Sequence, residues 1–299
     1  MENMDSLKIV YTLWTKPLTE LNDSLGFNSL EAFMDSLILS VNVSKQNYDD
    51  VQFYTDNYGM ELIKPYMDQL PFSKIHNTLD ELNWLPSQWW AYPKMYVYSL
   101  QDGPFIHIDN DAYLWHGIPE KYISNNDVIC QSLEDLEASG YWFYKDGIRV
   151  YDKHILENMK DVSHYKFAMN AGVFGAFNKK GINMFKELSK NAKKVAETVL
   201  KDKYLLDFID WKDLRNWDAF LYNVLMEQYY PYTYCIDNGL NVLRLLETDL
   251  PFTHLISAAK RDNKKMEKVK KRVNLKIWNL ENVEKQYKNN TYPLDQATL

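Results

Sequence analysis

The alternation of apolar and polar stretches at the start of the chain predicts two strands separated by a helix. Residues 7–14, LKIVYTLW, are rich in β-branched and aromatic side chains and precede polar residues, so they predict a buried first strand. Apolar residues recur at helical spacing over 30–45, behind a capping residue at Asn28 or Ser29. Residues 50–59, DVQFYTDNYG, predict a second strand that leads into a turn. This order of elements indicates a parallel sheet covered by helices.

The same alternation continues through the middle of the chain. Residues 89–101 predict a helix that Pro93 opens, and the mostly apolar FIHI at 105–108 predicts a buried strand. Residues 165–178 predict a strand, a turn of small residues and another strand, and two helical segments follow. The pattern as a whole predicts the α/β class, with a Rossmann-like, mostly parallel central sheet flanked by helices.

From Lys260 onward the chain becomes rich in basic residues. Nine Lys or Arg residues and two acidic residues lie between Lys260 and Lys276, and Met266, Val269 and Val273 fall on one face of a predicted amphipathic helix. We therefore expect one domain over residues 1–259 and a basic, helical C-terminal extension over 260–299. The lysines of this extension either lie in solvent or attract anionic lipid headgroups at a membrane surface.

Composition and charge exclude several classes of protein. The 299 residues are 46% hydrophobic and carry a net charge of −7, which disfavours a nucleic-acid binder because such proteins present a basic face to phosphates. Two cysteines are too few for a disulfide framework, so a reducing compartment is expected. The chain start lacks the features of a signal peptide, and no stretch reaches the roughly 20 apolar residues of a membrane span. We expect a cytoplasmic protein.

The segment that follows the predicted FIHI strand carries the first candidate chemistry. Asp109 and Asp111 flank Asn110 just beyond the carboxyl end of a strand, the edge where ligands bind in open α/β sheets. Two carboxylates so close together repel each other unless a cation lies between them or one is protonated. Hard oxygen ligands suit Mg²⁺ or Mn²⁺. The triplet is also compatible with a solvated turn.

A hydrophobic strand followed by Asp109-Asn110-Asp111 resembles the D-x-D motif of nucleotide-sugar glycosyltransferases with the GT-A fold. Other short segments are similar, in the same chain order, to those of retaining galactosyltransferase and glycogenin-like members. The matching residues are Lys94, fifteen residues before Asp109; Asn170, Ala171, Gly172 and Val173 in MNAGVFGAFN; Asp218 at a helix start; and His254 and Lys260 in HLISAAK. Ser257 replaces the glycine of the family segment H-x-x-G-x-x-K-P-W, and Arg261-Asp262 replaces its Pro-Trp.

The resemblance implies a metal site and a site for the donor phosphates. Asp109, Asp111 and His254 would hold a divalent cation, with the imidazole favouring Mn²⁺ over Mg²⁺. Lys94 and Lys260 would contact the donor and assist the departure of the nucleoside diphosphate.

The resemblance also implies a sugar pocket and a reaction. Asn170, Ala171 and Gly172 would line the pocket of the donor sugar, and Asp218 would act on that sugar as a nucleophile or by stabilising its positive charge. The implied activity moves a hexose from a UDP-sugar to a glycan or lipid-linked glycan acceptor with retention of configuration. The implied setting is synthesis of a surface polysaccharide or lipopolysaccharide, with the basic extension at the inner face of the membrane.

Two other classes of function stay open at this stage. His107 and Asp109 share a face of the predicted strand, and with Asp111 they would form the compact metal site of a metallohydrolase. The aromatic clusters, among them Trp89-Trp90, would alternatively serve a non-catalytic glycan-binding module by stacking on sugar faces.

Overall fold

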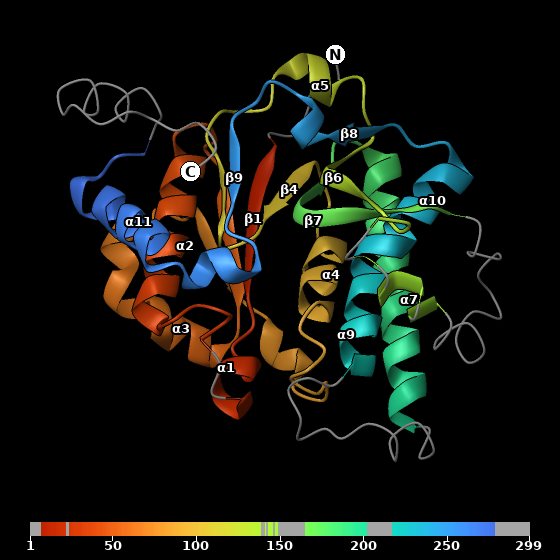
Figure 1. The fold of residues 1–299 in the computed structure, drawn as a ribbon, viewed down its shortest axis with the longest axis horizontal. Helices are drawn as coiled ribbons and strands as arrows, with labels where there is room; N and C mark the ends of the chain where they lie inside the picture. The colour runs from red at the N-terminus through yellow and green to blue at the C-terminus, as the bar shows by residue number, and fades with distance from the viewer. Residues whose placement is uncertain are drawn as a thin grey trace.

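A seven-stranded sheet runs through the centre of the molecule, between two layers of helices (Figure 1). The computed structural model describes residues 7–21, 24–138, 141, 143–145, 147–148, 165–201 and 217–278, and of residues 217–219 and 257 it describes only the backbone. The strands follow the order β3-β2-β1-β4-β7-β6-β8 across the sheet. Their bounds are β1 Lys8–Leu13, β2 Val51–Thr55, β3 Lys74–Asn77, β4 Phe105–Ile108, β6 Val128–Asp135, β7 Phe167–Ala176 and β8 Val242–Arg244.

Most neighbouring strands of the sheet are parallel. Strand β1 lies parallel to β2 and β4, β2 lies parallel to β3, and β6 lies parallel to β8. Strand β7 is antiparallel to both of its neighbours, β4 and β6. The predicted α/β class, with a mostly parallel central sheet flanked by helices, is confirmed.

Helices cover both faces of the sheet (Figure 1). One layer holds α2, α3 and α11, and the other holds α4, α7, α9 and α10. The helix bounds are α1 Lys16–Leu21, α2 Leu30–Lys45, α3 Asn57–Ile63, α4 Tyr92–Ser99, α5 Glu120–Ile123, α7 Lys179–Lys201, α9 Trp217–Val224, α10 Tyr230–Asn238 and α11 Asn263–Leu275. A small antiparallel sheet of β5 (Ala112–Leu114) and β9 (Phe252–His254) lies beside the main one.

Alternate side chains of β1 pack into two hydrophobic cores, one on each face of the sheet. Ile9, Tyr11 and Leu13 pack in the core on the α2 side of the sheet, whereas Val10 packs in the core on the α4 side. Successive side chains of a strand point to opposite faces, so a strand covered by helices on both sides must be apolar nearly throughout. This is why the first strand reads as a continuous apolar run in the sequence.

The predicted helix over 30–45 begins where the capping analysis places it. The Ser29 hydroxyl accepts a hydrogen bond from the Ala32 amide at 3.1 Å, so Ser29 is the N-cap of α2. The alternative cap, Asn28, instead donates its side-chain amide to the Arg261 carbonyl at 2.9 Å. The loop before α2 is thereby tied to the segment that follows β9.

The predicted strand, turn and strand over 165–178 is wrong. Residues Phe167–Ala176 form one continuous strand, β7, which lies between β4 and β6. The small residues serve close approach between strands, because a Cβ on Gly175 would lie 2.2 Å from the Phe105 carbonyl oxygen of β4.

The predicted turn at the end of 50–59 is the start of a helix. Asp56 accepts a hydrogen bond from the Gly59 amide at 2.8 Å and so caps α3. The same carboxylate accepts from the Thr15 amide at 2.7 Å, which joins the loop after β1 to the loop after β2.

The basic segment after β9 packs back onto the body of the protein. Met266, Val269 and Val273 are buried against α2, as the amphipathic pattern predicts, and Lys270 pairs with Glu31 of α2 at 2.7 Å. The division at residue 260 stays a prediction, and residues 279–299 lie outside the described part of the chain. None of the helices in the described ranges combines the length and apolar character that a membrane crossing requires.

Candidate metal and ligand site

Backbone pairing brings the acidic pair and His254 together. The chain turns at the end of β4, where the Asp109 amide donates to the Gly172 carbonyl at 3.0 Å and the Ala112 amide donates to the Asp109 carbonyl at 2.9 Å. Strand β5 then pairs with β9, which sets Ala112 opposite His254, and the Leu255 amide donates to the Asp111 carbonyl at 2.9 Å. Two segments more than 140 residues apart in the chain thus meet at one sheet edge.

Asp109, Asp111 and His254 form a cluster of possible metal ligands. Each offers one ligand atom, and these atoms lie within 4.8 Å of one another. His254 Nε2 lies 3.3 Å from Asp111 Oδ1 and 4.0 Å from Asp109 Oδ2. The three residues that the resemblance assigns to the metal are therefore close enough together to share one cation.

The tautomer of His254 fits a cation at this place. The Nδ1 atom of His254 lies 2.8 Å from Gln131 Oε1, and an amide oxygen can only accept, so Nδ1 carries the proton. This leaves Nε2, which faces the two carboxylates, as the nitrogen that would bind a cation. Two carboxylates with one imidazole suit Mn²⁺ or Mg²⁺.

Gly172 makes the contact between His254 and Gln131 possible. A Cβ at this position would lie 2.3 Å from Gln131 Oε1 and 2.4 Å from His254 Nδ1, well inside van der Waals contact. Gly172 therefore leaves room for the imidazole and the amide that orients it. Gly172 thus has a structural role at the candidate metal site, in addition to its predicted place in the sugar pocket.

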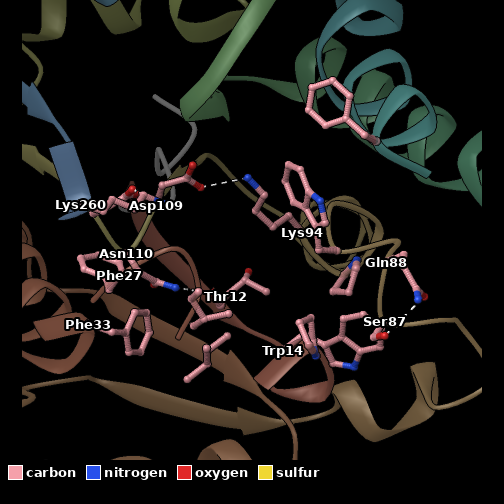
Figure 2. Close-up of a pocket in the computed structure, with 17 residues that line it drawn as sticks. Thr12, Trp14, Phe27, Phe33, Ser87, Gln88, Lys94, Asp109, Asn110 and Lys260 are labelled. Carbon is pink, nitrogen blue, oxygen red and sulfur yellow. Dashed lines mark hydrogen bonds and ion pairs between the residues drawn. The ribbon is translucent and has the colours of Figure 1, made fainter. Parts of the chain in front are cut away.

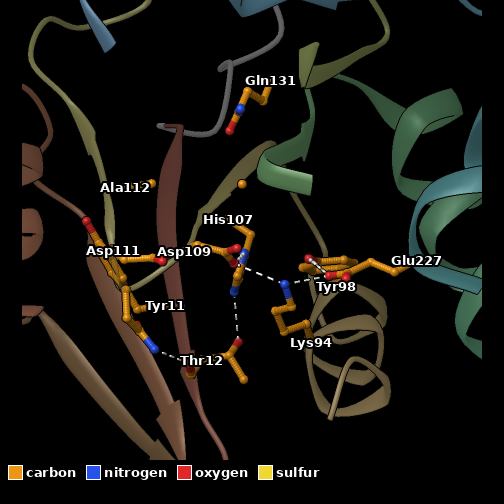
Figure 3. Close-up of polar contacts among 12 residues, drawn as sticks. Tyr11, Thr12, Lys94, Tyr98, His107, Asp109, Asp111, Ala112, Gln131 and Glu227 are labelled. Carbon is orange, nitrogen blue, oxygen red and sulfur yellow. Dashed lines mark hydrogen bonds and ion pairs between the residues drawn. The ribbon is translucent and has the colours of Figure 1, made fainter. Parts of the chain in front are cut away.

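Two lysines flank the cluster. Lys260 Nζ lies 2.6 Å from Asp111 Oδ2. Lys94 Nζ lies 3.0 Å from Asp109 Oδ1 (Figure 3). Burial by itself would raise the pKa of Asp111, but the contact with His254 and the charge of Lys260 hold it below its ordinary range. Asp111 is therefore a carboxylate anion, as a metal ligand must be.

Lys94 is held between two carboxylates. Its Nζ atom lies 3.0 Å from Asp109 Oδ1 and 2.7 Å from Glu227 Oε1 (Figure 3). Burial favours the neutral amine, but the charges of Asp109 and Glu227 outweigh it and raise the pKa of Lys94 above its ordinary value. Lys94 stays protonated, and it lies beside the metal cluster as the resemblance implies.

Glu227 is a member of the site that the sequence analysis missed. Its side chain is fully buried, and burial raises its pKa to about 7, with Lys94 opposing the rise. The residue lies in a π-helical turn, Leu225–Tyr229, between α9 and α10. Pro231 has no N–H to donate to the carbonyl of residue 227, which favours the wider turn at this point. The available signal was one acidic residue among the apolar residues of a helix.

Asn170 is held at both ends of its amide. Its Nδ2 donates to Glu134 Oε1 at 2.7 Å, and its Oδ1 accepts from the Gly172 amide at 3.0 Å. The side chain is thus fixed in one orientation at the wall of a cavity that Ala171 and Gly172 also line. The backbone of Asp218 lies in α9, but its side chain lies outside the described atoms.

Two cavities meet at Asp109. The first, about 400 Å³ in volume, lies at the end of β1 and is lined by Thr12, Trp14, Phe27 and Phe33 among others (Figure 2). The second has a volume of about 570 Å³. The residues that line both cavities are Trp90, Lys94, Asp109 and Lys260. The acidic cluster and its two lysines therefore lie at the junction of the two cavities.

His107 lies outside the metal cluster among the described residues. Its Nε2 contacts the Thr12 hydroxyl at 3.2 Å, and its Nδ1 lies 3.8 Å from Asp109 Oδ1 (Figure 3). Burial and the charge of Lys94 hold its pKa well below the ordinary value, so the ring is neutral. The metallohydrolase alternative, which requires His107 as a ligand, has no support from this arrangement.

Solved structures with a detectable likeness to the chain include three described as transferases. Mouse xyloside xylosyltransferase 1, in its apo form, is 9% identical over 80% of this chain and 84% of its own, with a TM-score of 0.40. The inositol-1-phosphate CTP transferase from T. maritima is 12% identical over 90% of this chain and 97% of its own, with a TM-score of 0.39. The glycosyltransferase GlyE of Streptococcus pneumoniae TIGR4 is 12% identical over 98% of this chain and 66% of its own, also with a TM-score of 0.39.

These similarities are too low to indicate a function, so the function has to be inferred from the residues of the site. No curated protein matches the sequence at a significant level. One family model does match, over residues 7–280, and its description is a family of unknown function, DUF6734. Because this match covers nearly the whole sequence, the chain belongs to the DUF6734 family.

Proposed function

We propose that the chain is a metal-dependent glycosyltransferase that moves a hexose from a nucleotide diphosphate sugar, most simply a UDP-sugar, to a hydroxyl group of a glycan acceptor. The observation that carries the proposal is the convergence of Asp109, Asp111 and His254 with two lysines at the junction of two cavities. A divalent cation bound there would supply positive charge against the phosphates of the donor.

The two lysines support a role in the departure of the nucleoside diphosphate. Lys94 and Lys260 lie on opposite sides of the acidic pair, and each is already fixed by an ion pair at 2.6–3.0 Å. Charges held in place before the reaction stabilise a developing negative charge without having to reorganise. In this proposal both ammonium groups face the diphosphate and lower the barrier to its release.

The two cavities suit the two halves of such a donor. The first is lined by aromatic and apolar side chains, including Trp14, Phe27 and Phe33, which suit a flat nucleobase and a ribose. The second is lined by Asn170, Ala171, Gly172, Glu227 and Gln228, which suit a small polyhydroxyl ring. In this proposal the diphosphate lies between them, beside Asp109.

The remaining parts of the proposal come from the resemblance. We propose retention of configuration, with Asp218 acting on the sugar at its anomeric carbon. We also propose a glycan or lipid-linked glycan acceptor, a place in surface polysaccharide synthesis, and a cytoplasmic location with contact between the basic segment after residue 260 and an anionic membrane. The exposed lysines on α11, among them Lys264, Lys268 and Lys271, support that contact.

A thermal-shift screen tests the proposal directly. With Mn²⁺ present, UDP at 100 times its dissociation constant should add about 2.7 kcal/mol to the free energy of unfolding, which is a visible rise in melting temperature. The matched variant Asp111→Asn should lose most of that rise, because it removes a ligand of the proposed cation. No shift with any nucleoside diphosphate, and no turnover of any nucleotide sugar, would defeat the proposal.

A further inference from the structure

Glu227 lies at the wall of the second cavity. Its side chain is fully buried, and the cavity beside it has a volume of about 570 Å³. Its Oε1 atom lies 2.7 Å from Lys94 Nζ and accepts a hydrogen bond from the Tyr98 hydroxyl at 3.3 Å (Figure 3). Both of these contacts engage the same carboxylate oxygen, Oε1.

The other carboxylate oxygen has no hydrogen-bond partner in the described part of the chain. Oε2 of Glu227 is buried, and among the described residues no donor reaches it. Buried polar atoms in proteins nearly always have a partner, and one that lacks it calls for a water or a ligand as the donor. Glu227 is among the residues that line the cavity, so a small turn of its carboxylate would bring Oε2 to a donor bound there.

The neighbouring amides of the cavity are already engaged inside the protein. Asn170 bonds to Glu134 and to the Gly172 amide, at 2.7 and 3.0 Å. Gln228 contacts the hydroxyl of Tyr144. Glu227 Oε2 therefore differs from these groups, because it is a strong acceptor whose capacity is unused.

We propose that Glu227 selects the transferred sugar by accepting, at Oε2, a hydrogen bond from one of its hydroxyl groups. This inference rests on the proposed function and assigns to that site a specificity residue outside the matched motifs. A sugar attached to a diphosphate beside Asp109 and Lys94 would enter the cavity that Glu227 lines. A donor without the hydroxyl would leave the buried oxygen unpaired, which is how enzymes reject close analogues.

The test is a double-mutant cycle on binding, in which one change removes a hydroxyl group from the donor and the other changes Glu227. Calorimetric titration with Mn²⁺ present, at about pH 8.5 where a group with a pKa of about 7 is ionised, would compare UDP-glucose, UDP-galactose and their 2-, 3-, 4- and 6-deoxy analogues. UDP alone is the reference. In the wild-type protein, one deoxy donor should bind about 10-fold more weakly than its parent, the loss expected for a hydrogen bond to a charged group. In Glu227→Gln that difference should fall to less than about 3-fold, because the charged acceptor is gone.

The measured quantity is the ratio of the affinity for a deoxy donor to the affinity for its parent. A change in phosphate binding through Lys94 would alter both affinities equally and leave this ratio unchanged. The matched control is Tyr98→Phe, which removes the other hydrogen bond to Glu227 but leaves Oε2 in place, so the deoxy penalty should remain. Should Glu227→Gln fail to fold, Glu227→Asp keeps the charge but withdraws the oxygen, and it should lose the penalty too.

Two outcomes separate this inference from the proposed function. If UDP and its sugars bind but no single hydroxyl matters in the wild-type protein, or the penalty is unchanged in Glu227→Gln, the role of Glu227 is overturned and the glycosyltransferase proposal stands. If neither UDP nor any UDP-sugar binds, both fall together.

Discussion

Gly172 determines how the imidazole of the candidate metal site is held. The space that its side chain would occupy is filled by the ring of His254 and the amide of Gln131, which lie 2.8 Å apart. Metal-binding histidines are commonly oriented by such a partner on the other ring nitrogen, and loss of the partner weakens metal binding 10- to 100-fold. One residue without a side chain in β7 thus determines the position of a candidate metal ligand in β9.

Substituting Gly172 by Ala should therefore weaken metal binding. The added methyl would push Gln131 and His254 apart, and we expect the affinity for Mn²⁺ to fall by about 10-fold or more. Calorimetric titration with Mn²⁺ measures it. The matched control is Gly117→Ala, where the nearest atom to a Cβ lies at an ordinary 3.6 Å and neither folding nor affinity should change. Equal Mn²⁺ affinity in Gly172→Ala and the wild type would contradict this account of the glycine.

Removing the charge of Lys260 should move two affinities in opposite directions. Its ammonium lies 2.6 Å from Asp111, where it competes with a cation for the same carboxylate. Lys260→Gln should raise Mn²⁺ affinity by a few fold and lower UDP affinity by about 10-fold, because one positive charge facing the phosphates is gone. The exposed Lys264 supplies the control variant Lys264→Gln, which should change neither affinity. A parallel loss of both affinities in Lys260→Gln would indicate a purely structural role.

At the scale of elements, β7 is the strand whose structure was predicted wrongly from the local sequence pattern. Its run of Ala and Gly is typical of a turn, yet the segment lies in the sheet between β4 and β6. Small residues are needed there because the backbone of β4 comes within 2.2 Å of the place of a Cβ on Gly175. The close packing of these strands in turn sets the Gly172 carbonyl 3.0 Å from the Asp109 amide and fixes the turn that carries the acidic pair.

Gly175→Ala should therefore destabilise the sheet. The new methyl collides with the backbone of β4, and such overpacking typically costs about 1–3 kcal/mol of the free energy of unfolding. Urea unfolding of Gly175→Ala and of Gly117→Ala measures the difference between a crowded and an open glycine. Equal midpoints in the two variants would mean that β4 and β7 are not packed as described.

The sequence predicted those parts of the fold and site that depend on local pattern. The period of apolar residues locates the β1 strand and the α2 helix with its cap, and the acidic pair follows from its place after a strand. His254 came from the resemblance, because nothing in its own neighbourhood says that β9 will pair with β5. Glu227 was missed for the same reason: its contact with Lys94 depends on the packing of a π-helical turn against α4, which no local pattern encodes.

At the scale of the whole molecule, the site draws its charges from four distant parts of the chain. The ion-paired cluster contains three carboxylates, Asp109, Asp111 and Glu227, and two lysines, Lys94 and Lys260. Above the pKa of about 7 of Glu227, the three carboxylates and two lysines of this described cluster carry a net charge of −1, which disfavours a diphosphate. A bound divalent cation reverses the sign to +1. The balance of charges therefore predicts that nucleotide binding depends on the metal.

The most direct test is a calorimetric titration of Mn²⁺, without nucleotide, into the wild-type protein and into the variants His254→Ala and His107→Leu. We expect one site in the wild type, an affinity at least about 10-fold weaker in His254→Ala, and an unchanged affinity in His107→Leu. Among the residues that the structure describes, His254 joins Asp109 and Asp111 in the cluster and His107 does not. Binding that survives in His254→Ala and is lost in His107→Leu, with both variants folded, would contradict this expectation.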